Sequence, residues 1–201
     1  MNINPDILKL YAITNGDSAE DVELALKGGV TCIQLRNKTE NRTEIIRRGM
    51  EIKKICRKYN VPFIVNDDYK IALECGADGV HVGLSDTPVA EIRKATGADF
   101  IIGATAKTIE QAEKAQADGA DYLGVGAVFP SPTKTDAIRI TPENLKEICS
   151  SVKIPVVAIG GITADNLHII DNCGQCGIAV VSAVFGQQDI KSSAERLRAE
   201  L

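Results

Sequence analysis

The eight residues CGADGVHV, at positions 75–82, combine the end of a helix with the start of a strand. Glycine is common just beyond a helix end, and the run GVHV that follows it is short, mostly apolar and rich in β-branched valine. Three further segments repeat this arrangement: GGVTCIQL at 28–35, DGADYLGV at 118–125 and CGQCGIAV at 173–180. Repetition of one helix-to-strand junction predicts an architecture of repeated βα units.

Eight strands are predicted along the chain. Each is a short apolar run followed by a polar turn and by a segment with apolar residues at helical spacing. The predicted strands are residues 8–14, 32–36, 63–66, 79–83, 100–105, 122–128, 155–160 and 178–183. Buried strands joined by helices form a parallel sheet, and eight such units can close into a barrel. We therefore predict an α/β fold, a (β/α)8 TIM barrel, as a single domain over residues 1–201.

Helices are predicted between the strands, among them a long one over 43–60, one over 164–174 and a last one through AERLRAEL at 194–201. The alternative fold is an open doubly wound sheet, which usually has a glycine-rich phosphate-binding turn after its first strand. The segment TNGDSAED at 14–21 is not such a turn. The barrel is therefore the favoured fold.

The composition narrows the class of protein. With 201 residues, 44% of them hydrophobic, the chain can bury one substantial core, and a formal net charge of −4 gives no basic surplus for a nucleic acid. No run of 18 apolar residues marks a membrane span, and the first residues lack the pattern of a secretory signal. We expect a cytoplasmic protein without a nucleic-acid or membrane partner.

The six cysteines lie mostly in apolar, periodic segments, which predicts reduced thiols in the core. Cys173 and Cys176 form a CGQC sequence, so a redox pair is the alternative. In redox proteins such a pair opens a helix after a strand, whereas this one is predicted to close a helix before a strand. His81 and His168 are the only histidines, and their spacing does not suggest zinc.

In a TIM barrel, the chemistry belongs at the carboxyl ends of the strands. Unusual polar residues follow the predicted strands at that end. They are Gln34, Arg36 and Lys38, then Asn66, Asp67 and Asp68, then Ser85 and Asp86, then Thr105 and Lys107, and finally Ser131, Thr133 and Lys134.

Asp67 and Asp86 follow neighbouring strands, so their carboxylates are predicted to converge on one hard cation, with substrate phosphates and water as the other ligands. This pattern favours Mg²⁺. The alternative for Asp86 is that it caps a helix that begins near Pro88.

Gly160 and Gly161 end the seventh predicted strand, where barrels often bind phosphate with loop amides. The alternative is a tight turn with no ligand. Arg36, Lys38 and Lys134 are predicted cations for a diphosphate at the same rim, although Lys38 taken alone would be interpreted as a solvated loop residue.

Six ordered motifs resemble the thiamine phosphate synthase family over nearly the whole chain. They are QLRNK at 34–38, VNDD at 65–68, DGVHVGLSD at 78–86, FPSPTK at 129–134, IGGIT at 159–163 and VVSA at 180–183. The resemblance implies a Mg²⁺-dependent transferase with two small-molecule substrates. It would join 4-amino-2-methylpyrimidin-5-ylmethyl diphosphate to a thiazole ethyl phosphate, giving thiamine phosphate and diphosphate through a pyrimidinylmethyl cation.

The resemblance also implies a role for each matching residue. Asp67 and Asp86 would bind the metal, and Lys134 would meet the diphosphate. The pyrimidine diphosphate would be held by Gln34, Arg36, Lys38, Asn66 and Thr105. The thiazole phosphate would be held by Ser131, Pro132, Thr133, Gly161, Val181 and Ser182. Within this set, Arg36, Thr105 and Lys134 are the expected catalytic residues.

The chain departs from the family in GATAKT at 103–108, where Thr105 and Lys107 replace the common serine and histidine. Two other functions are considered: a thiazole tautomerase-like isomerase, which has no need of a diphosphate site, and a non-catalytic sensor of a phosphorylated ligand. Retention of the acids and cations at the rim favours the transferase. A sugar-phosphate epimerase would need metal-binding histidines, and this chain has only two histidines.

Overall fold

The computed structural model describes residues 3–37, 41–130 and 139–201. Its eight parallel strands form one closed barrel in chain order, in which the first strand also pairs with the last. The strands are β1 (Leu10–Ile13), β2 (Cys32–Leu35), β3 (Phe63–Asn66), β4 (Gly79–Val82), β5 (Ile101–Ala106), β6 (Tyr122–Gly126), β7 (Val156–Ile159) and β8 (Gly177–Val180). The predicted (β/α)8 fold is confirmed.

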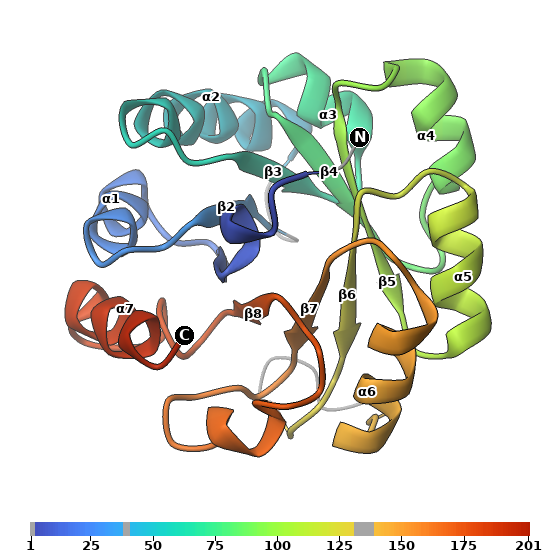
Figure 1. Ribbon diagram of the computed structural model, residues 1–201. Coiled ribbons are helices and arrows are strands. Elements are labelled where there is room, and N and C mark those ends of the chain that lie inside the picture. The colour runs from blue at the N-terminus through green and yellow to red at the C-terminus, as the bar shows by residue number, and fades with distance from the viewer. Residues whose placement is uncertain (1–2, 38–40, 131–138) are drawn as a thin grey trace.

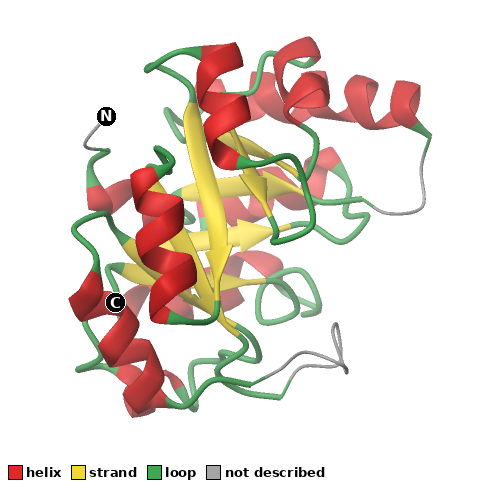
Figure 2. Cartoon of the chain, turned by 90° about the vertical axis from the view of Figure 1, so that its right-hand side faces the viewer, coloured by secondary structure: helices red, strands yellow, loops and turns green. Residues whose placement is uncertain are grey.

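Helices surround this barrel on its outside (Figure 1 and Figure 2). They are α1 (Ala19–Lys27), α2 (Arg42–Lys58), α3 (Tyr69–Glu74), α4 (Val89–Thr96), α5 (Ile109–Ala117), α6 (Pro142–Ser151) and α7 (Ile190–Ala199). Most begin at a polar residue whose side chain accepts a first-turn N–H, such as Ser18 before α1 and Thr141 before α6. Both of these residues complete a capping box.

The buried apolar side chains divide between the inside and the outside of the barrel. Alternate strand residues such as Leu10, Ala12 and Ile33 pack against the helices. The intervening residues, among them Tyr11 and Tyr122, pack with one another in a second cluster within the barrel. Alternation of side chains along each strand produces this division.

The repeated junction has a structural role at the amino-terminal ends of the strands. Asp78 Oδ2 accepts the backbone N–H of Phe63, and Asp121 Oδ2 accepts that of Ile102, at 2.8 Å in both cases. Thr31 Oγ1, at the same position of its own repeat, accepts the N–H of Leu10 at 2.9 Å. Each of these side chains therefore ties the start of its own strand to the preceding strand.

Three of the predicted boundaries that differ from the structure do so because a local turn replaces regular structure. The first strand was predicted from Leu8, but Pro5–Leu8 is a 3₁₀ helix, η1, because the Asn4 side chain accepts the Asp6 N–H and Pro5 fits a first helical turn. The helix predicted over 164–174 is reduced to the 3₁₀ helix η2 (Leu167–Ile170). The last strand ends at Val180 instead of 183 because a helical turn follows it.

Candidate active site

The closed parallel barrel brings the carboxyl ends of all eight strands to one mouth. The predicted site residues that the structure describes lie in the last part of these strands or in the loops that follow them. They are Gln34, Arg36, Asn66, Asp67, Asp86, Thr105, Gly161, Val181 and Ser182. Lys38, Ser131, Pro132, Thr133 and Lys134 lie outside the described residues.

Arg36 is held by the end of β1. Its backbone N–H donates to Thr14 Oγ1 at 3.0 Å, and its Nη1 donates to Asn15 Oδ1 at 3.2 Å. Thr14 is fully buried, whereas Arg36 is half-buried. The loop after β1, to which sequence reasoning gave no role, therefore orients a cation at the mouth.

The two adjacent acids after β3 have different environments. Asp68 caps α3 by accepting the N–H groups of Lys70 and Ile71, and its other oxygen pairs with Arg42 at 3.2 Å. Asp67 has a φ of +65°, in the left-handed region that few side chains adopt. Its backbone N–H donates to the carbonyl of His81 at 2.8 Å, so the chain continues alongside β4 as it turns. This turn separates the Asp67 side chain from the helix cap.

Asp86 does not cap a helix, so the alternative considered for it is wrong. α4 begins at Val89, and its N-cap, Pro88, has no side-chain capping hydrogen bond. Asp86 Oδ2 instead accepts the Gly83 N–H at 2.7 Å and closes its own loop. In the described part of the chain, the other oxygen, Oδ1, accepts no hydrogen bond. The carboxylate can therefore use that oxygen for a cation.

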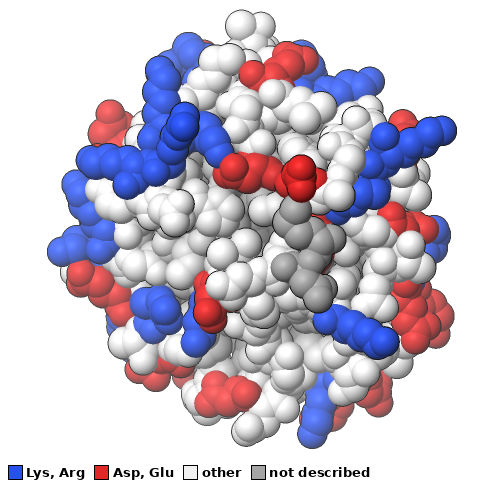
Figure 3. All heavy atoms as spheres, turned by 45° about the horizontal axis from the view of Figure 1, so that its top comes forward, with Lys and Arg blue, Asp and Glu red and all other residues white. Residues whose placement is uncertain are grey.

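The residues present fit a magnesium ion that takes part of its coordination from substrate. Within the described ranges, no group of three or more His, Cys, Asp and Glu side chains could hold a metal. Two carboxylates with phosphate oxygens and water are a normal set of Mg²⁺ ligands, because this ion keeps several waters. On the face in Figure 3, acidic and basic side chains are interspersed rather than gathered into one basic surface.

Gly160 and Gly161 have φ angles of +106° and +61°, and both are required by close packing against the chain after β6. A Cβ on Gly161 would lie 2.1 Å from the carbonyl oxygen of Pro130, and one on Gly160 would lie 2.6 Å from Ala127 Cα. Phe129 N–H also donates to the Gly160 carbonyl at 2.9 Å. The turn therefore packs against residues 127–130, directly after β6, whatever ligand it binds.

A helical turn follows β8 at the same end of the barrel. The N–H of Phe185 donates to the Val181 carbonyl at 2.9 Å, and that of Gly186 donates to the Ser182 carbonyl at 3.1 Å. Ser182 is exposed, whereas Val181 is half-buried. Both residues are thus presented at the mouth by the first part of this turn.

Inside the barrel, five polar side chains form a continuous series of hydrogen bonds. The sequence analysis gave a role in substrate binding to the two end members, Gln34 and Thr105, but to none of the three between them. Gln34 Nε2 donates to Tyr11 Oη at 2.6 Å, and Tyr11 Oη lies 2.9 Å from Tyr122 Oη. His81 connects Tyr122 to Thr105. Its Nδ1 lies 3.1 Å from Tyr122 Oη, and its Nε2 lies 3.1 Å from Thr105 Oγ1. Burial raises the pKa of Tyr11 and Tyr122 well above the usual value, so both hydroxyls stay protonated.

Two glycines on neighbouring strands make room for these rings. A Cβ on Gly103 would lie 2.1 Å from Tyr122 Cζ, and one on Gly124 would lie 3.0 Å from His81 Cε1. Polar or aromatic residues at inward positions beside strand glycines were the available sequence signal. Their partners on other strands could not be found without the barrel's register.

A family model described as thiamine monophosphate synthase matches residues 10–184 of the chain. The chain belongs to the thiamine monophosphate synthase family. A thiamine-phosphate synthase of Ruminiclostridium cellulolyticum is 53% identical over 178 residues, which cover 89% of this chain and 85% of that one. Another, of Methanobrevibacter smithii, is 46% identical, with 96% and 95% covered.

Solved structures agree with this family. A thiamine phosphate pyrophosphorylase from Pyrococcus furiosus has a TM-score of 0.92 and 42% identity, and the match covers 98% of this chain and 96% of that one. A 3-hexulose-6-phosphate synthase has a TM-score of 0.73 at 20% identity, covering 96% and 100%, which shows the fold alone. None of the described helices is both long enough and apolar enough to cross a membrane.

All six cysteines of this family member are unpaired. Desolvation raises the pKa of Cys56 and of Cys149 to about 12 and that of Cys176 to about 11. Iodoacetamide at pH 8 is therefore expected to label these thiols far more slowly in the native protein than after unfolding, because the thiolate is the reactive form. Mass spectrometry of the alkylated peptides measures both rates. Labelling of Cys173 and Cys176 as fast in the native as in the unfolded protein would instead favour the redox pair.

If the turn after β7 shapes the phosphate site that the sequence predicts, Gly161→Ala should weaken binding of a thiazole phosphate by about tenfold, since the methyl group forces this turn away from Pro130, at a cost of about 1–3 kcal/mol. Isothermal titration with the thiazole phosphate measures the change. Gly174→Ala is the control, because Gly174 also has a positive φ, +90°, but lies before β8, at the opposite end of the barrel. Equal affinities in the two variants would show that the turn does not shape the phosphate site.

Proposed function

We propose that this chain is a thiamine-phosphate synthase. In the proposed reaction, the 4-amino-2-methylpyrimidin-5-ylmethyl group passes from its diphosphate to a thiazole ethyl phosphate. The observation that carries the proposal is the family match over residues 10–184, which includes the strand ends where the polar residues gather. The proposed partners are these two small-molecule substrates, without a nucleic acid or a membrane.

The proposed reaction needs charge stabilisation rather than a protein nucleophile. The bond from the methylene carbon to the diphosphate oxygen breaks, and both electrons leave with the diphosphate. The lone pair of the thiazole nitrogen then forms the new carbon–nitrogen bond. Groups that stabilise the leaving diphosphate in the transition state therefore accelerate the reaction.

The rim residues have roles suited to this chemistry. Arg36 and Lys134 bind the departing diphosphate, and Lys38 and Asn66 position it. Asp67 and Asp86 would hold a Mg²⁺ ion, which would supply positive charge against the negative charge of the diphosphate. Gln34 and Thr105 contact the pyrimidine. The thiazole phosphate is held by Ser131, Pro132, Thr133, Gly161, Val181 and Ser182.

The geometry of the Arg36 side chain supports its proposed role in binding the diphosphate. Its contact with Asn15 uses one nitrogen of the guanidinium, so the remaining N–H groups can form a fork toward two phosphate oxygens. Lysine at position 107 has no imidazole, and its backbone N–H is bound by Gln111 at the start of α5. The proposed mechanism therefore assigns no proton transfer to this position.

The test is formation of thiamine phosphate by the purified protein from both substrates, with Mg²⁺ and with EDTA in its place. Product is measured by chromatography after oxidation to its fluorescent thiochrome. Mg²⁺-dependent product supports the synthase. Isomerisation of the thiazole without condensation would indicate the tautomerase-like isomerase, and binding without turnover would indicate the sensor. Because all six cysteines are unpaired, we also propose a reducing compartment, the cytoplasm.

A further inference from the structure

The hydrogen bonds inside the barrel have a direction. Gln34 Nε2 donates to Tyr11 Oη at 2.6 Å, so the Tyr11 hydroxyl hydrogen points elsewhere. Among the described residues, Tyr122 Oη is the one oxygen or nitrogen atom within reach of it, at 2.9 Å. Tyr11 is only 1% exposed, so water does not replace this acceptor.

The same direction continues to Thr105. Because the Tyr122 hydroxyl accepts from Tyr11, its own hydrogen is available to His81 Nδ1 at 3.1 Å. His81 Nδ1 then carries a lone pair, and the ring proton lies on Nε2, which donates to Thr105 Oγ1 at 3.1 Å. The Thr105 hydroxyl accepts this bond, and its hydrogen remains to be donated to a ligand.

We propose that Tyr11, Tyr122 and His81 are positioning residues that fix the polarity of the pyrimidine site. They leave Gln34 Oε1 as an acceptor and the Thr105 hydroxyl as a donor toward the bound ring. The inference rests on the proposed function, because that function supplies the pyrimidine. It extends that function by assigning three residues that need not touch the substrate.

This polarity matches a 4-aminopyrimidine. Its exocyclic amine is a donor, which suits Gln34 Oε1, and its ring nitrogens are acceptors, which suit the Thr105 hydroxyl. In the 4-oxo analogue, a carbonyl replaces the amine and a ring N–H replaces one acceptor. Gln34 Oε1 would then face the carbonyl oxygen, a second acceptor, and the Thr105 hydroxyl would face the ring N–H, a second donor. A ligand that leaves buried polar groups unpaired in this way binds much more weakly.

The direction can be measured without activity. The chain has two histidines, so long-range ¹H–¹⁵N spectra of ¹⁵N-histidine protein contain two ring systems, and His168→Asn identifies the signals of His81. His81 is expected to be protonated on Nε2 and unprotonated on Nδ1. A proton on Nδ1 would overturn the proposed direction, and Tyr11 would then donate to the weak acceptor Cys32 Sγ, with which it also interacts.

Tyr122→Phe tests the effect on specificity. Phenylalanine retains the ring beside Gly103 but removes both hydroxyl contacts, so the series is interrupted between Tyr11 and His81. The ratio of kcat/KM for the amino substrate to that for its 4-oxo diphosphate analogue is expected to fall by about tenfold. The His81 spectrum of this variant is expected to show a mixture of the two tautomers.

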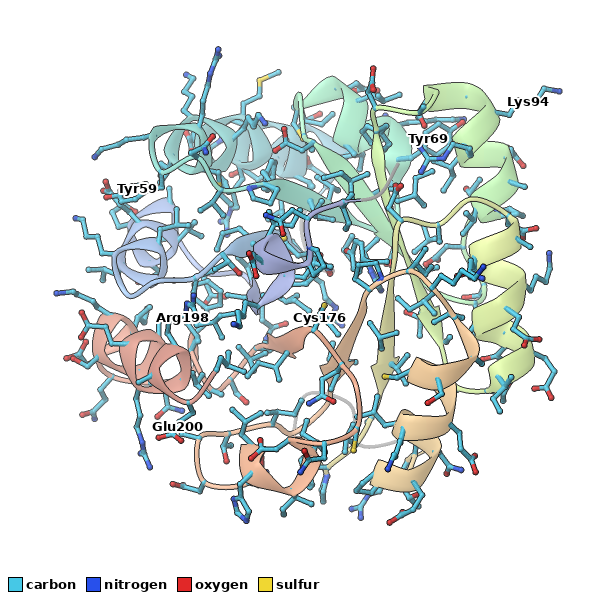
Figure 4. All side chains as sticks on the ribbon, in the orientation of Figure 1. Tyr59, Tyr69, Lys94, Cys176, Arg198 and Glu200 are labelled. Carbon is cyan, nitrogen blue, oxygen red and sulfur yellow. The ribbon has the colours of Figure 1, made fainter. Side chains whose placement is uncertain are left out.

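Tyr59→Phe is the matched control. Its hydroxyl donates to Glu23 Oε1 at 2.9 Å, and its side chain lies outside the barrel between α1 and α2 (Figure 4). This variant is expected to keep the wild-type ratio and the wild-type tautomer. An unchanged ratio in Tyr122→Phe would overturn the positioning role. Failure of the wild-type protein to make thiamine phosphate would instead overturn the proposed function, and the tautomer would still report the direction of the bonds.

Discussion

Asp86→Asn is expected to lower kcat/KM for thiamine phosphate formation by about 10²- to 10³-fold, the usual cost of removing one charge-stabilising group from an active site. The amide oxygen of asparagine can still accept the Gly83 N–H, so the loop after β4 keeps its closing hydrogen bond. What is lost is the negative charge of the proposed metal ligand. The Mg²⁺ concentration for half-maximal rate should therefore rise, as measured by titration of the initial rate.

Asp68→Asn is the control for this variant. Asp68 lies at the same rim, but its carboxylate caps α3 and pairs with Arg42, and asparagine is an equally good cap. Its Mg²⁺ dependence is expected to match that of the wild-type protein. If Asp86→Asn also kept a normal Mg²⁺ dependence, Asp86 would have no place in the metal site.

Asp121→Ala is expected to lower the free energy of unfolding by about 3–5 kcal/mol, the typical loss when one partner of a buried ion pair is removed. Asp121 is 2% exposed, and its Oδ2 accepts both Arg93 Nη2 at 2.6 Å and the Ile102 N–H at 2.8 Å. Alanine leaves both donors without this acceptor. Urea denaturation followed by circular dichroism measures the change.

The surface pair Lys114–Asp118, in which Lys114 is exposed, provides the comparison, because screened surface pairs contribute little. Asp118→Ala is expected to keep a denaturation midpoint close to that of the wild-type protein. Since Asp121 precedes β6, at the end of the barrel opposite the mouth, the folded Asp121→Ala variant should retain its kcat. Equal midpoints in the two variants would show that the buried pair does not stabilise the barrel.

The prediction of the fold depended on local signals, which the chain carries strongly. Every strand was placed correctly within a few residues, because a run of apolar residues between turn residues is decided by near neighbours. The errors were at the ends: the turn after Val180 and the 3₁₀ helix η1 depend on local hydrogen bonds that periodicity does not reveal. The helix predicted over 164–174 is shortened to the 3₁₀ helix at 167–170.

The candidate site was also predicted only in part from the sequence. Acids and cations at the ends of strands could be found because a parallel barrel has one catalytic rim, but their individual environments could not. Asp67 and Asp68 are neighbours in sequence, yet Asp67 has a positive φ and donates its backbone N–H to the His81 carbonyl, whereas the Asp68 carboxylate caps α3. For Asp86, a loop hydrogen bond took the place of the helix cap that its position suggested.

The sequence by itself determined the barrel and the rim at which the polar residues lie, since these follow from spacing along the chain, and it indicated the family through the six motifs that resemble it. Tertiary structure alone decided that Tyr11, Tyr122 and His81 connect Gln34 to Thr105 across the interior. These residues are far apart in sequence and come from five different strands. Only the closure and register of the barrel bring their polar atoms within hydrogen-bonding distance.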